Sequence, residues 1–430
     1  MERYEAFKDS GVEWIGEIPK EWALARTKAL FASKKRIVGD RANKYQRLAL
    51  TMQGVLLRDK DDNEGLQPEQ FEGYQILEAN ELVFKLIDLE NIKTSRVGLS
   101  PYTGIVSPAY ITLARPNSDN RYFYYWFFAL YQQNVFNRLG GNGVRSALNK
   151  DDLLNLPMPL PGGDEQQAIA DHLDAKTAEI DALVADCERE VELLQEYRKA
   201  VISEAVTKGL DPDAPMKDSG VEWISEIPAT WKPYRMSALF REVAETGYPD
   251  LPILTVSINT GISDEELDDD QLERRVNRSA DRHVYKRVLK GDLAYNMMRA
   301  WQGSIGASRV DGIVSPAYTV LRPRSADVAL ASYVEYLLRT QSAIVELRRR
   351  SYGIADFRLR LYWQYFKDMT IYLPSIEEQR EIVRHLDART HELDELSNEL
   401  SSMAEQLRDY RKSLICEAVI GKFKVPVHSA

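Results

Sequence analysis

The stretch Lys8–Trp22 reads KDSGVEWIGEIPKEW, and Lys217–Trp231 repeats it as KDSGVEWISEIPATW. Twelve of these fifteen positions match, at an offset of 209 residues. The heptapeptide GIVSPAY at Gly104–Tyr110 likewise returns unchanged at Gly312–Tyr318. Solenoid repeats are about 20–50 residues long, so a period of this size indicates duplication of a whole domain. We therefore predict two equivalent halves, with GIVSPAY on a strand of each.

Two segments without glycine or proline, 165–208 and 375–420, carry the rest of the repeat. EQ…HLDAKTAEIDAL begins at Glu165 and returns from Glu378, now at an offset of 213, and YRK recurs at the same offset. Leucine and other apolar residues recur every seven positions in both segments, at Leu173, Ile180, Cys187, Leu194, Val201 and at Leu386, Leu393, Leu400, Leu407, Leu414. A sustained seven-residue repeat is typical of helices that pair in a coiled coil.

The order of elements favours an antiparallel pair, because a pseudo-twofold axis across the helices exchanges their ends. The heptads at 173–205 span about 50 Å at 1.5 Å per residue, so we expect a globular unit at each end of the pair. Opposing residue 173 to residue 418 keeps Cys187 away from Cys416, which predicts two unbridged thiols. Packing of each helix on its own globular domain is the alternative.

We predict an α+β chain made of two mixed α/β domains and two long antiparallel helices. Pro-rich exits at Leu156–Gly163 and Met369–Ser375 mark the domain ends. The predicted limits are 1–160 and 216–373 for the domains, 161–215 for the first helix with its linker, and 374–430 for the second helix. The expected strands are Arg47–Met52, Glu81–Leu86, Ile111–Ala114, Leu251–Ile258, Asp292–Met297 and Tyr318–Leu321, and the expected domain helices are Arg121–Asn137 and Val328–Arg350.

Composition bounds the class of protein. Of the 430 residues, 44% are hydrophobic and two are cysteine, which predicts well-packed domains in a reducing compartment. No apolar run approaches 18 residues, so we expect a cytoplasmic protein without membrane contact. The net charge of −10 is carried by the two helical segments, since the domains are each close to neutral. Local basic clusters on the domains therefore remain compatible with nucleic-acid binding.

The chain resembles the specificity subunit of type I DNA restriction–modification enzymes over essentially its whole length. The motifs that carry the resemblance each occur twice: WIGEIP…W, GIVSPAY, LP…EQ…HLD and YRK…EAV. The resemblance implies that each domain is a target-recognition domain that reads half of a bipartite, asymmetric site on double-stranded DNA. It also implies that the helices dock two methyltransferase subunits, with restriction/translocase subunits joining the complex.

The resemblance implies a chain that is not an enzyme. S-adenosylmethionine, ATP and Mg belong to the partner subunits in that family, and no cofactor is expected on this chain. The residues agree, because neither a phosphate-binding GxxxxGK[ST] loop nor a GxGxxG turn is present, and His and Cys lack metal-ligand spacing. Ser107 and Ser315 of SPAY lack a neighbouring His, so a nucleophilic role is not expected.

Basic residues interleaved with polar and aromatic ones are the DNA-binding candidates, because they contact phosphates and base edges. In the first domain they are Lys34, Lys35, Arg36, Arg41, Lys44, Arg47, Gln53, Lys93, Thr94, Ser95, Arg96, Tyr102, Asn142 and Arg145. In the second domain they are Arg274, Arg275, Arg278, Asn296, Arg299, Trp301, Gln302, Arg348, Arg349, Arg350, Tyr352, Arg358 and Arg360. Any one of them has a simpler reading as a solvated surface charge.

Two other functions fit the same pattern. The chain could be a stand-alone DNA-binding regulator, or a coiled-coil adaptor whose basic clusters are incidental. Salt-dependent DNA binding by the chain alone separates the adaptor from the other two. The Trp and Ile residues of the WIGEIP…W segments are read as core, with partner docking as the alternative.

Overall fold

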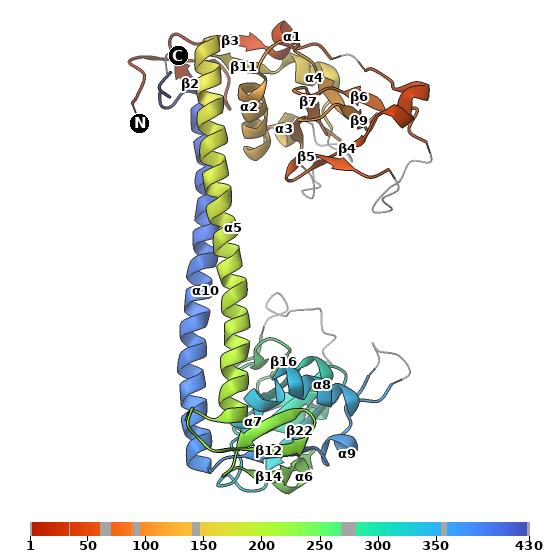
Figure 1. The fold of residues 1–430 in the computed structure, drawn as a ribbon, viewed down its shortest axis with the longest axis vertical. Helices are drawn as coiled ribbons and strands as arrows, with labels where there is room; N and C mark the ends of the chain where they lie inside the picture. Colours follow the sequence, from red (N-terminus) through yellow and green to blue (C-terminus); the bar gives the residue numbers. More distant parts are fainter. Residues whose placement is uncertain are drawn as a thin grey trace. The chain divides into compact units, whose positions relative to one another are not determined.

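The computed structural model describes residues 2–33, 35–60, 70–87, 89, 95–139, 147–267, 281–353 and 359–427. The chain divides into two compact units, the first formed by Met1–Glu188 with Ser401–Ala430 and the second by Arg189–Leu400. The residues of the long helices α5 (Gly163–Lys208) and α10 (Ile376–Val419), labelled in Figure 1, are divided between the two units. They begin close to the predicted limits at 161 and 374, while the domain boundaries themselves stay a prediction.

The first unit contains a mixed α/β domain. Its sheets have the strand orders β5-β4-β9-β6, β10-β7-β8, β1-β2 and β11-β3. The strands are β1 (Phe7–Asp9), β2 (Glu17–Pro19), β3 (Ala23–Arg26), β4 (Arg47–Thr51), β5 (Gly54–Arg58), β6 (Gln75–Leu77), β7 (Leu82–Phe84), β8 (Val97–Leu99), β9 (Gly104–Val106), β10 (Ile111–Leu113) and β11 (Pro157–Leu160). The helices are α1 (Thr27–Leu30), the 3-10 turn η1 (Gly39–Lys44), α2 (Arg121–Gln132), α3 (Val135–Leu139) and α4 (Lys150–Asn155).

The second unit contains a domain of the same class. Its sheets have the orders β15-β22-β19-β20, β18-β21, β16-β17, β12-β13 and β14-β23. The strands are β12 (Met216–Val221), β13 (Ile224–Pro228), β14 (Lys232–Arg235), β15 (Phe240–Val243), β16 (Val256–Ser257), β17 (Gly261–Ile262), β18 (Lys286–Val288), β19 (Leu293–Asn296), β20 (Ile305–Ala307), β21 (Gly312–Val314), β22 (Tyr318–Pro323) and β23 (Thr370–Leu373). The helices are α6 (Met236–Leu239), η2 (Arg282–Val284), η3 (Ala300–Gln302), α7 (Ala331–Leu338), α8 (Gln341–Arg349) and α9 (Trp363–Phe366).

The sequence repeat is a repeat of topology. The order β10-β7-β8 of the first domain returns as β22-β19-β20 in the second, and the pairs β6-β9 and β3-β11 return as β18-β21 and β14-β23. All of these pairs are antiparallel. The prediction of two mixed α/β domains with an internal repeat is therefore confirmed.

The WIGEIP…W segments belong to the cores of their domains. Ile18 and Ile227 are fully buried, and Trp22 and Trp231 are almost so. The EIP residues of each segment lie in the second strand of a short hairpin, β1-β2 in the first unit and β12-β13 in the second. The core interpretation of these residues is confirmed, and the docking alternative loses its support, because side chains buried in the fold offer no surface.

Two predicted helices are each broken in two. The segment 121–137 turns at Asn134, whose φ of 59° lies in the left-handed region that Asn tolerates, so α2 ends before it and α3 follows. The segment 328–350 breaks at Thr340, whose side-chain oxygen accepts from the amide of Ala343 and begins α8. Apolar periodicity continues across both breaks, which is why it predicted single helices.

Several predicted strands are shorter than expected; of Glu81–Leu86, for example, β7 covers Leu82–Phe84. Of Leu251–Ile258, a strand covers Val256–Ser257, and Ile253 makes an isolated bridge to Ile313. Pro252 contributes here through its carbonyl, which accepts from Ile313, because proline has no amide hydrogen. Within GIVSPAY the strand stops after Val106 or Val314, since the proline that follows turns the chain.

Helices α5 and α10 pair in opposite directions within each unit. In the first unit Arg411 forms an ion pair with Asp181 at 2.8 Å, and Arg408 pairs with Glu188. In the second unit Arg198 reaches Asp394 at 3.3 Å. Rising numbers on one helix oppose falling numbers on the other, so the antiparallel prediction is confirmed.

The predicted heptad positions lie along both helices, and one of them, Leu386, packs in the core of the second domain. Leu173, Ile180, Cys187, Leu386, Leu393 and Leu414 are buried, and the remaining predicted seam residues are partly buried. Cys187 and Cys416 are both free thiols, as predicted, and burial raises the pKa of Cys416. Across the described ranges, no helix combines the length and the apolar character needed to cross a membrane.

Candidate nucleic-acid interface

The structure brings several predicted residues of the second domain together. The guanidinium of Arg348, at the end of α8, lies 5.6 Å from the ring centroid of Trp301 in η3. Beyond α8 the chain returns, and Tyr352 and Arg360 exchange two backbone hydrogen bonds of 2.9 Å. The amide of Leu361 then bonds the carbonyl of Met297, which ties this segment to the start of the η3 loop. We call Trp301, Arg348, Tyr352 and Arg360 the Arg–aromatic cluster.

Two tyrosines that the sequence reasoning missed extend this cluster. The rings of Tyr352 and Tyr365 lie 4.1 Å apart with an angle of 35° between their planes, and Tyr362 contacts Tyr365 edge-on at 6.5 Å. All three rings are exposed to solvent, Tyr352 by 54%. Exposed aromatic faces beside guanidinium groups are the surfaces on which nucleic-acid bases stack. The sequence signal was the spacing YWQY at Tyr362–Tyr365, directly after the basic run.

Two other arginines of the run are held by carboxylates of the same unit. Arg349 forms a two-pronged ion pair with Glu222 at 2.6 and 3.0 Å, and Arg350 bonds Glu346 at 2.7 Å and the carbonyl of Tyr365 at 3.2 Å. These contacts fix the end of α8 against the β12-β13 hairpin and against α9. The geometry therefore assigns Arg349 and Arg350 an anchoring role, and DNA contact by them stays a prediction.

The loop from Asn296 to Gln302 is internally bonded. Asn296 is buried, and its side-chain oxygen accepts from the amide of Met298 at 3.0 Å. Arg299 donates to the side chain of Gln302 at 3.1 Å, and the indole of Trp301 donates to the carbonyl of Met298 at 3.0 Å. Arg299, Trp301 and Gln302 are partly exposed, so the loop presents these three side chains at the surface.

In the first domain, exposed basic residues gather on η1 and near it. Arg41 and Lys44 lie in η1, where Ala42 packs in a small core with Ile76 and Ile105. Lys35 and Gln53 are exposed, Gln53 at the turn between β4 and β5, and Tyr102 is exposed beside β9. These residues stay candidates for DNA contact.

Four other candidates of the first domain are engaged within the fold. Arg36 forms ion pairs with Glu78 at 2.8 Å and with Glu81. Arg47, Ser95 and Arg96 are buried: Arg47 lies over the ring of Phe71, and Arg96 donates to the carbonyl of Ile87. Burial gives these three a structural role in this conformation. The candidates Lys34, Lys93, Thr94, Asn142, Arg145, Arg274, Arg275, Arg278 and Arg358 lie outside the described residues.

The GIVSPAY motif supports the sheet of each domain. The Gln75 amide group donates to the carbonyls of Ser107 and Tyr110 at 2.9 and 2.6 Å, and the ammonium of Lys286 donates to the carbonyl of Tyr318 at 2.6 Å. Gln75 and Lys286 occupy the same place on β6 and β18, opposite Val106 and Val314. Burial lowers the pKa of Lys286. Equivalent turns are thus held by different side chains.

The repeated EQ…HLD motif fastens each domain to the start of a long helix. The indole of Trp22 donates to Glu165 at 3.0 Å, and the indole of Trp231 donates to Glu378 at 3.1 Å. We call these two arrangements the Trp–Glu joints. Nearby, the Tyr125 hydroxyl donates to Asp174 and that of Tyr336 to Asp387, both at 2.7 Å. Burial and the bond to Asp387 raise the pKa of Tyr336 to about 12. The sequence reasoning found the repeat but missed this role.

Within the described residues, no group of three or more His, Cys, Asp or Glu side chains is arranged to hold a metal ion. His172 is half-buried on α5, and its ring contacts Phe423 at 6.1 Å. Burial and, less strongly, Lys176 lower its pKa. His385, its repeat equivalent, is exposed on α10.

The sequence matches a family described as type I restriction modification DNA specificity domain over residues 60–193. It is 26% identical over 297 residues to the type I restriction enzyme EcoBI specificity subunit of Escherichia coli, covering 64% of this chain and 60% of that protein. It is 24% identical over 229 residues to a putative type I restriction enzyme MjaX specificity subunit of Methanocaldococcus jannaschii, covering 51% and 52%. The matched regions thus span about half to three-fifths of these relatives.

Two solved structures share the fold. A chain from work on complex assembly and conformational transition of the type I R-M system gives a TM-score of 0.65 at 14% identity, covering 94% of this chain and 99% of that one. The HsdS subunit of Thermoanaerobacter tengcongensis gives a TM-score of 0.52 at 15% identity, covering 94% and 98%.

Proposed function

We propose that this chain is a type I restriction–modification DNA specificity subunit and that it reads a bipartite, asymmetric DNA site with one half-site per domain, a proposal that the family match and the E. coli relative support. The carrying observation is the duplication: the two domains share the strand pairings named above and the Trp–Glu joint, but they carry different side chains on their loops. Equivalent frames with different surfaces suit two half-sites of different sequence.

The Arg–aromatic cluster supports DNA contact by the second domain. An exposed tyrosine pair, a tryptophan and two arginines combine a stacking surface with positive charge, the two features by which proteins bind nucleotides. In the first domain, DNA contact would be made by the exposed residues Lys35, Arg41, Lys44, Gln53 and Tyr102. Arginine contacts to guanine edges would supply specificity, and lysine contacts to phosphates would supply affinity.

The chain is proposed to act without catalysis of its own, in the cytoplasm, as part of a larger complex. Two methyltransferase subunits would dock on the helices and supply S-adenosylmethionine, and restriction/translocase subunits would supply ATP- and Mg-dependent cleavage. The acidic exposed faces of α5 and α10 are the surfaces offered for this docking, since most of the net negative charge lies there.

The test is methylation mapping in a host that expresses this chain together with a partner adenine methyltransferase. We expect methylated adenines in one motif made of two different short half-sites with a fixed gap. A contiguous motif, or methylation that is unchanged when this chain is omitted, would contradict the proposal. A purified chain that binds DNA with no dependence on salt would contradict phosphate contact.

A further inference from the structure

The two Trp–Glu joints differ in the hydrogen bonds that their glutamates accept. We call the first joint filled, because both carboxylate oxygens of Glu165 are bonded, and the second joint open, because a single bond to Glu378 is found among the described residues. In the first unit, both carboxylate oxygens of Glu165 accept hydrogen bonds, one from the indole of Trp22 and the other from the hydroxyl of Tyr4 at 2.5 Å. The Tyr4 ring packs edge-on against Trp22 at 5.8 Å and Phe7 at 6.3 Å. Burial, reinforced by the bond to Glu165, raises the pKa of Tyr4, so its hydroxyl remains a donor.

The backbone identifies the corresponding place in the second unit. The amide of Lys20 bonds the carbonyl of Ala6, and, 209 residues later, the amide of Ala229 bonds the carbonyl of Pro215. The residue two positions before Ala6 is Tyr4, and the residue two positions before Pro215 is Asp213. Asp213 is exposed, so the residue that corresponds to Tyr4 supplies no aromatic ring to the second joint.

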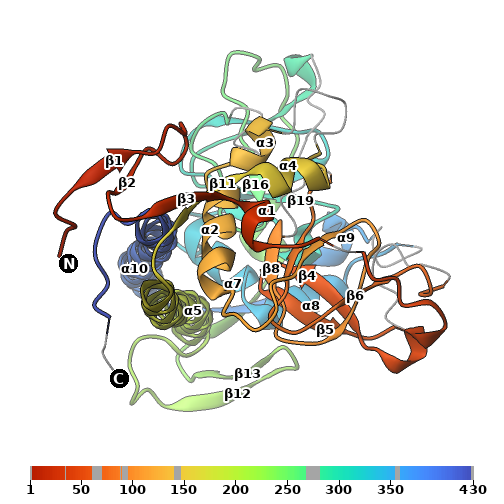
Figure 2. The same cartoon turned by 90° about the horizontal axis from the view of Figure 1, so that it is seen from above.

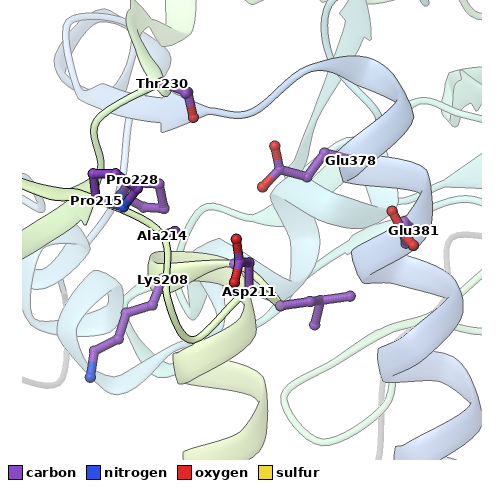
Figure 3. A pocket seen from close by; sticks show the side chains of 10 residues that line it. Lys208, Asp211, Ala214, Pro215, Pro228, Thr230, Glu378 and Glu381 are labelled. Atoms are coloured by element: carbon purple, nitrogen blue, oxygen red, sulfur yellow. The ribbon is translucent and has the colours of Figure 1, made fainter.

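A pocket of about 480 Å³ lies at the second joint, and Figure 3 shows the carboxylate of Glu378 pointing into it. Among the described residues, the oxygen of Glu378 that does not bond Trp231 accepts no hydrogen bond. The walls are the turn after α5, the strand end at Pro228 and Thr230, and the first turns of α10. Gly209 forms part of the wall with a φ of 79°, and a Cβ there would come within 3.3 Å of Glu378.

The charges of the pocket add a second requirement for its occupant. Among the described residues that line the pocket, Asp211, Glu378 and Glu381 are acidic and Lys208 is basic. In the first unit the position equivalent to Glu381 is Ala168. A side chain that enters the second pocket would therefore meet excess negative charge, which favours a neighbouring basic residue.

We propose that this pocket binds a tyrosine, flanked by a basic residue, from a partner polypeptide. The tyrosine hydroxyl would donate to the open oxygen of Glu378, as Tyr4 donates to Glu165. The flanking cation would lie toward Asp211 and Glu381. The filled joint is the pattern for the open one, and its own segment, Arg3-Tyr4, has the required chemistry. The proposal does not depend on DNA reading.

The test is a titration of the full chain with a peptide of its own residues 2–9, ERYEAFKD, observed through the indole N–H signals of the seven ¹⁵N-labelled tryptophans. We expect a saturable shift of the Trp231 signal, whereas the Trp22 signal stays in place because Tyr4 occupies that joint. A peptide with Tyr4→Phe should bind about tenfold more weakly, since it lacks the hydrogen bond to a charged acceptor.

Two chain variants locate the contact. In Glu378→Gln the tyrosine and phenylalanine peptides should bind alike, whereas Glu381→Gln should weaken both peptides equally and preserve their ratio. Equal binding of the two peptides to the unaltered chain, or no saturable shift at Trp231, would overturn the proposal. Self-association of the chain that is lost in Tyr4→Phe would assign the pocket to a second copy and would also overturn it. The titration contains no DNA, so its failure leaves the proposed function standing.

Discussion

The hydroxyl of Tyr122 donates a hydrogen bond to the carbonyl oxygen of Val419, 297 residues further along the chain, at 3.0 Å. Tyr122 lies on α2 of the first domain, and Val419 is the last residue of α10. The second unit repeats the contact, where Tyr333 of α7 donates to Val206 near the end of α5 at 2.9 Å. The last carbonyls of a helix lack partners within the helix, so each domain supplies one. Helix α5 thus begins at the Trp–Glu joint of the first unit and ends at Tyr333 in the second. Helix α10 begins at the joint of the second unit and ends at Tyr122 in the first.

Replacing Tyr122 with Phe should lower the free energy of unfolding of the first unit by about 1–2 kcal/mol, since buried carbonyls of Val419 and Pro159 lose their shared donor. Chemical denaturation of the full chain measures the change. Tyr124→Phe on the same helix is the matched control, since no hydrogen bond is found for its hydroxyl within the described residues, and it should change stability by less than about 0.5 kcal/mol. If Tyr122→Phe and Tyr124→Phe lower the free energy of unfolding equally, the hydrogen bond of Tyr122 does not stabilise the unit.

The same tyrosines predict a loss of stability in alkali. Burial raises the pKa values of Tyr122 and Tyr333 well above 10, whereas in the unfolded chain they ionise near 10. Above pH 10 the unfolded state releases protons that the folded state keeps, so stability falls as pH rises. The double variant Tyr122→Phe/Tyr333→Phe should show a shallower decline between pH 9 and 11, by at most about 1.4 kcal/mol per pH unit for each tyrosine. Denaturation midpoints that fall in parallel for both proteins would contradict this reasoning.

The filled and open joints predict unequal costs for the same substitution. Glu165→Ala removes the acceptor of both Tyr4 and Trp22, whereas Glu378→Ala removes that of Trp231 alone. We expect Glu165→Ala to destabilise its unit by about 1 kcal/mol more, because each unmade bond costs about that much. The comparison repeated in a Tyr4→Phe background isolates the cause, since the difference should then vanish. If the difference persists in the Tyr4→Phe background, its cause is not the hydrogen bond between Tyr4 and Glu165.

The repeat and the helix pairing could be predicted because they depend on local pattern. Two copies of one heptad seam, including Ile180 and Leu393, leave little choice of partner, and those side chains are buried. The breaks at Asn134 and Thr340 could not be predicted from periodicity, since a left-handed residue and a side-chain cap interrupt the backbone without disturbing the apolar spacing. Sheet order also escaped prediction, because strands of three residues carry almost no alternation.

In the candidate site, too, features set by local sequence could be predicted, whereas those set by distant contacts could not. Charge and residue type predicted the run from Arg348 to Arg360, and the structure brings Trp301 to Arg348. The sequence could not tell an exposed arginine from one with a carboxylate partner, such as Arg349 on Glu222, because that partner lies 127 residues away. It also could not predict that Arg96 is buried, since an isolated basic residue in a loop usually faces solvent.

Charge reversal at Arg348 and Arg360 tests the Arg–aromatic cluster directly. Both side chains are exposed at the surface of the second domain. The double Glu variant should bind DNA carrying the mapped motif more weakly, and the slope of log K against log salt should fall by about one unit per lost phosphate contact. Lys199→Glu, an exposed charge on α5, is the control and should leave both quantities unchanged. Unchanged affinity and slope in a folded double variant would make the cluster an ordinary surface.

The last prediction concerns exchange of the domains. The Trp–Glu joint and the tyrosine contact to a helix end occur in both units, so either domain should fit either place. We expect a chain in which residues 217–373 are replaced by a copy of 8–160 to fold, because Trp22 and Tyr122 of the copy can make the bonds of Trp231 and Tyr333. Antiparallel helices exchange their ends, so the two identical domains would face opposite DNA strands. The methylated motif should therefore change from two different half-sites to an inverted repeat of one, with the gap unchanged. Methylation mapping reads the outcome, and a folded exchange variant that still marks the original asymmetric motif would refute independent reading by the two domains.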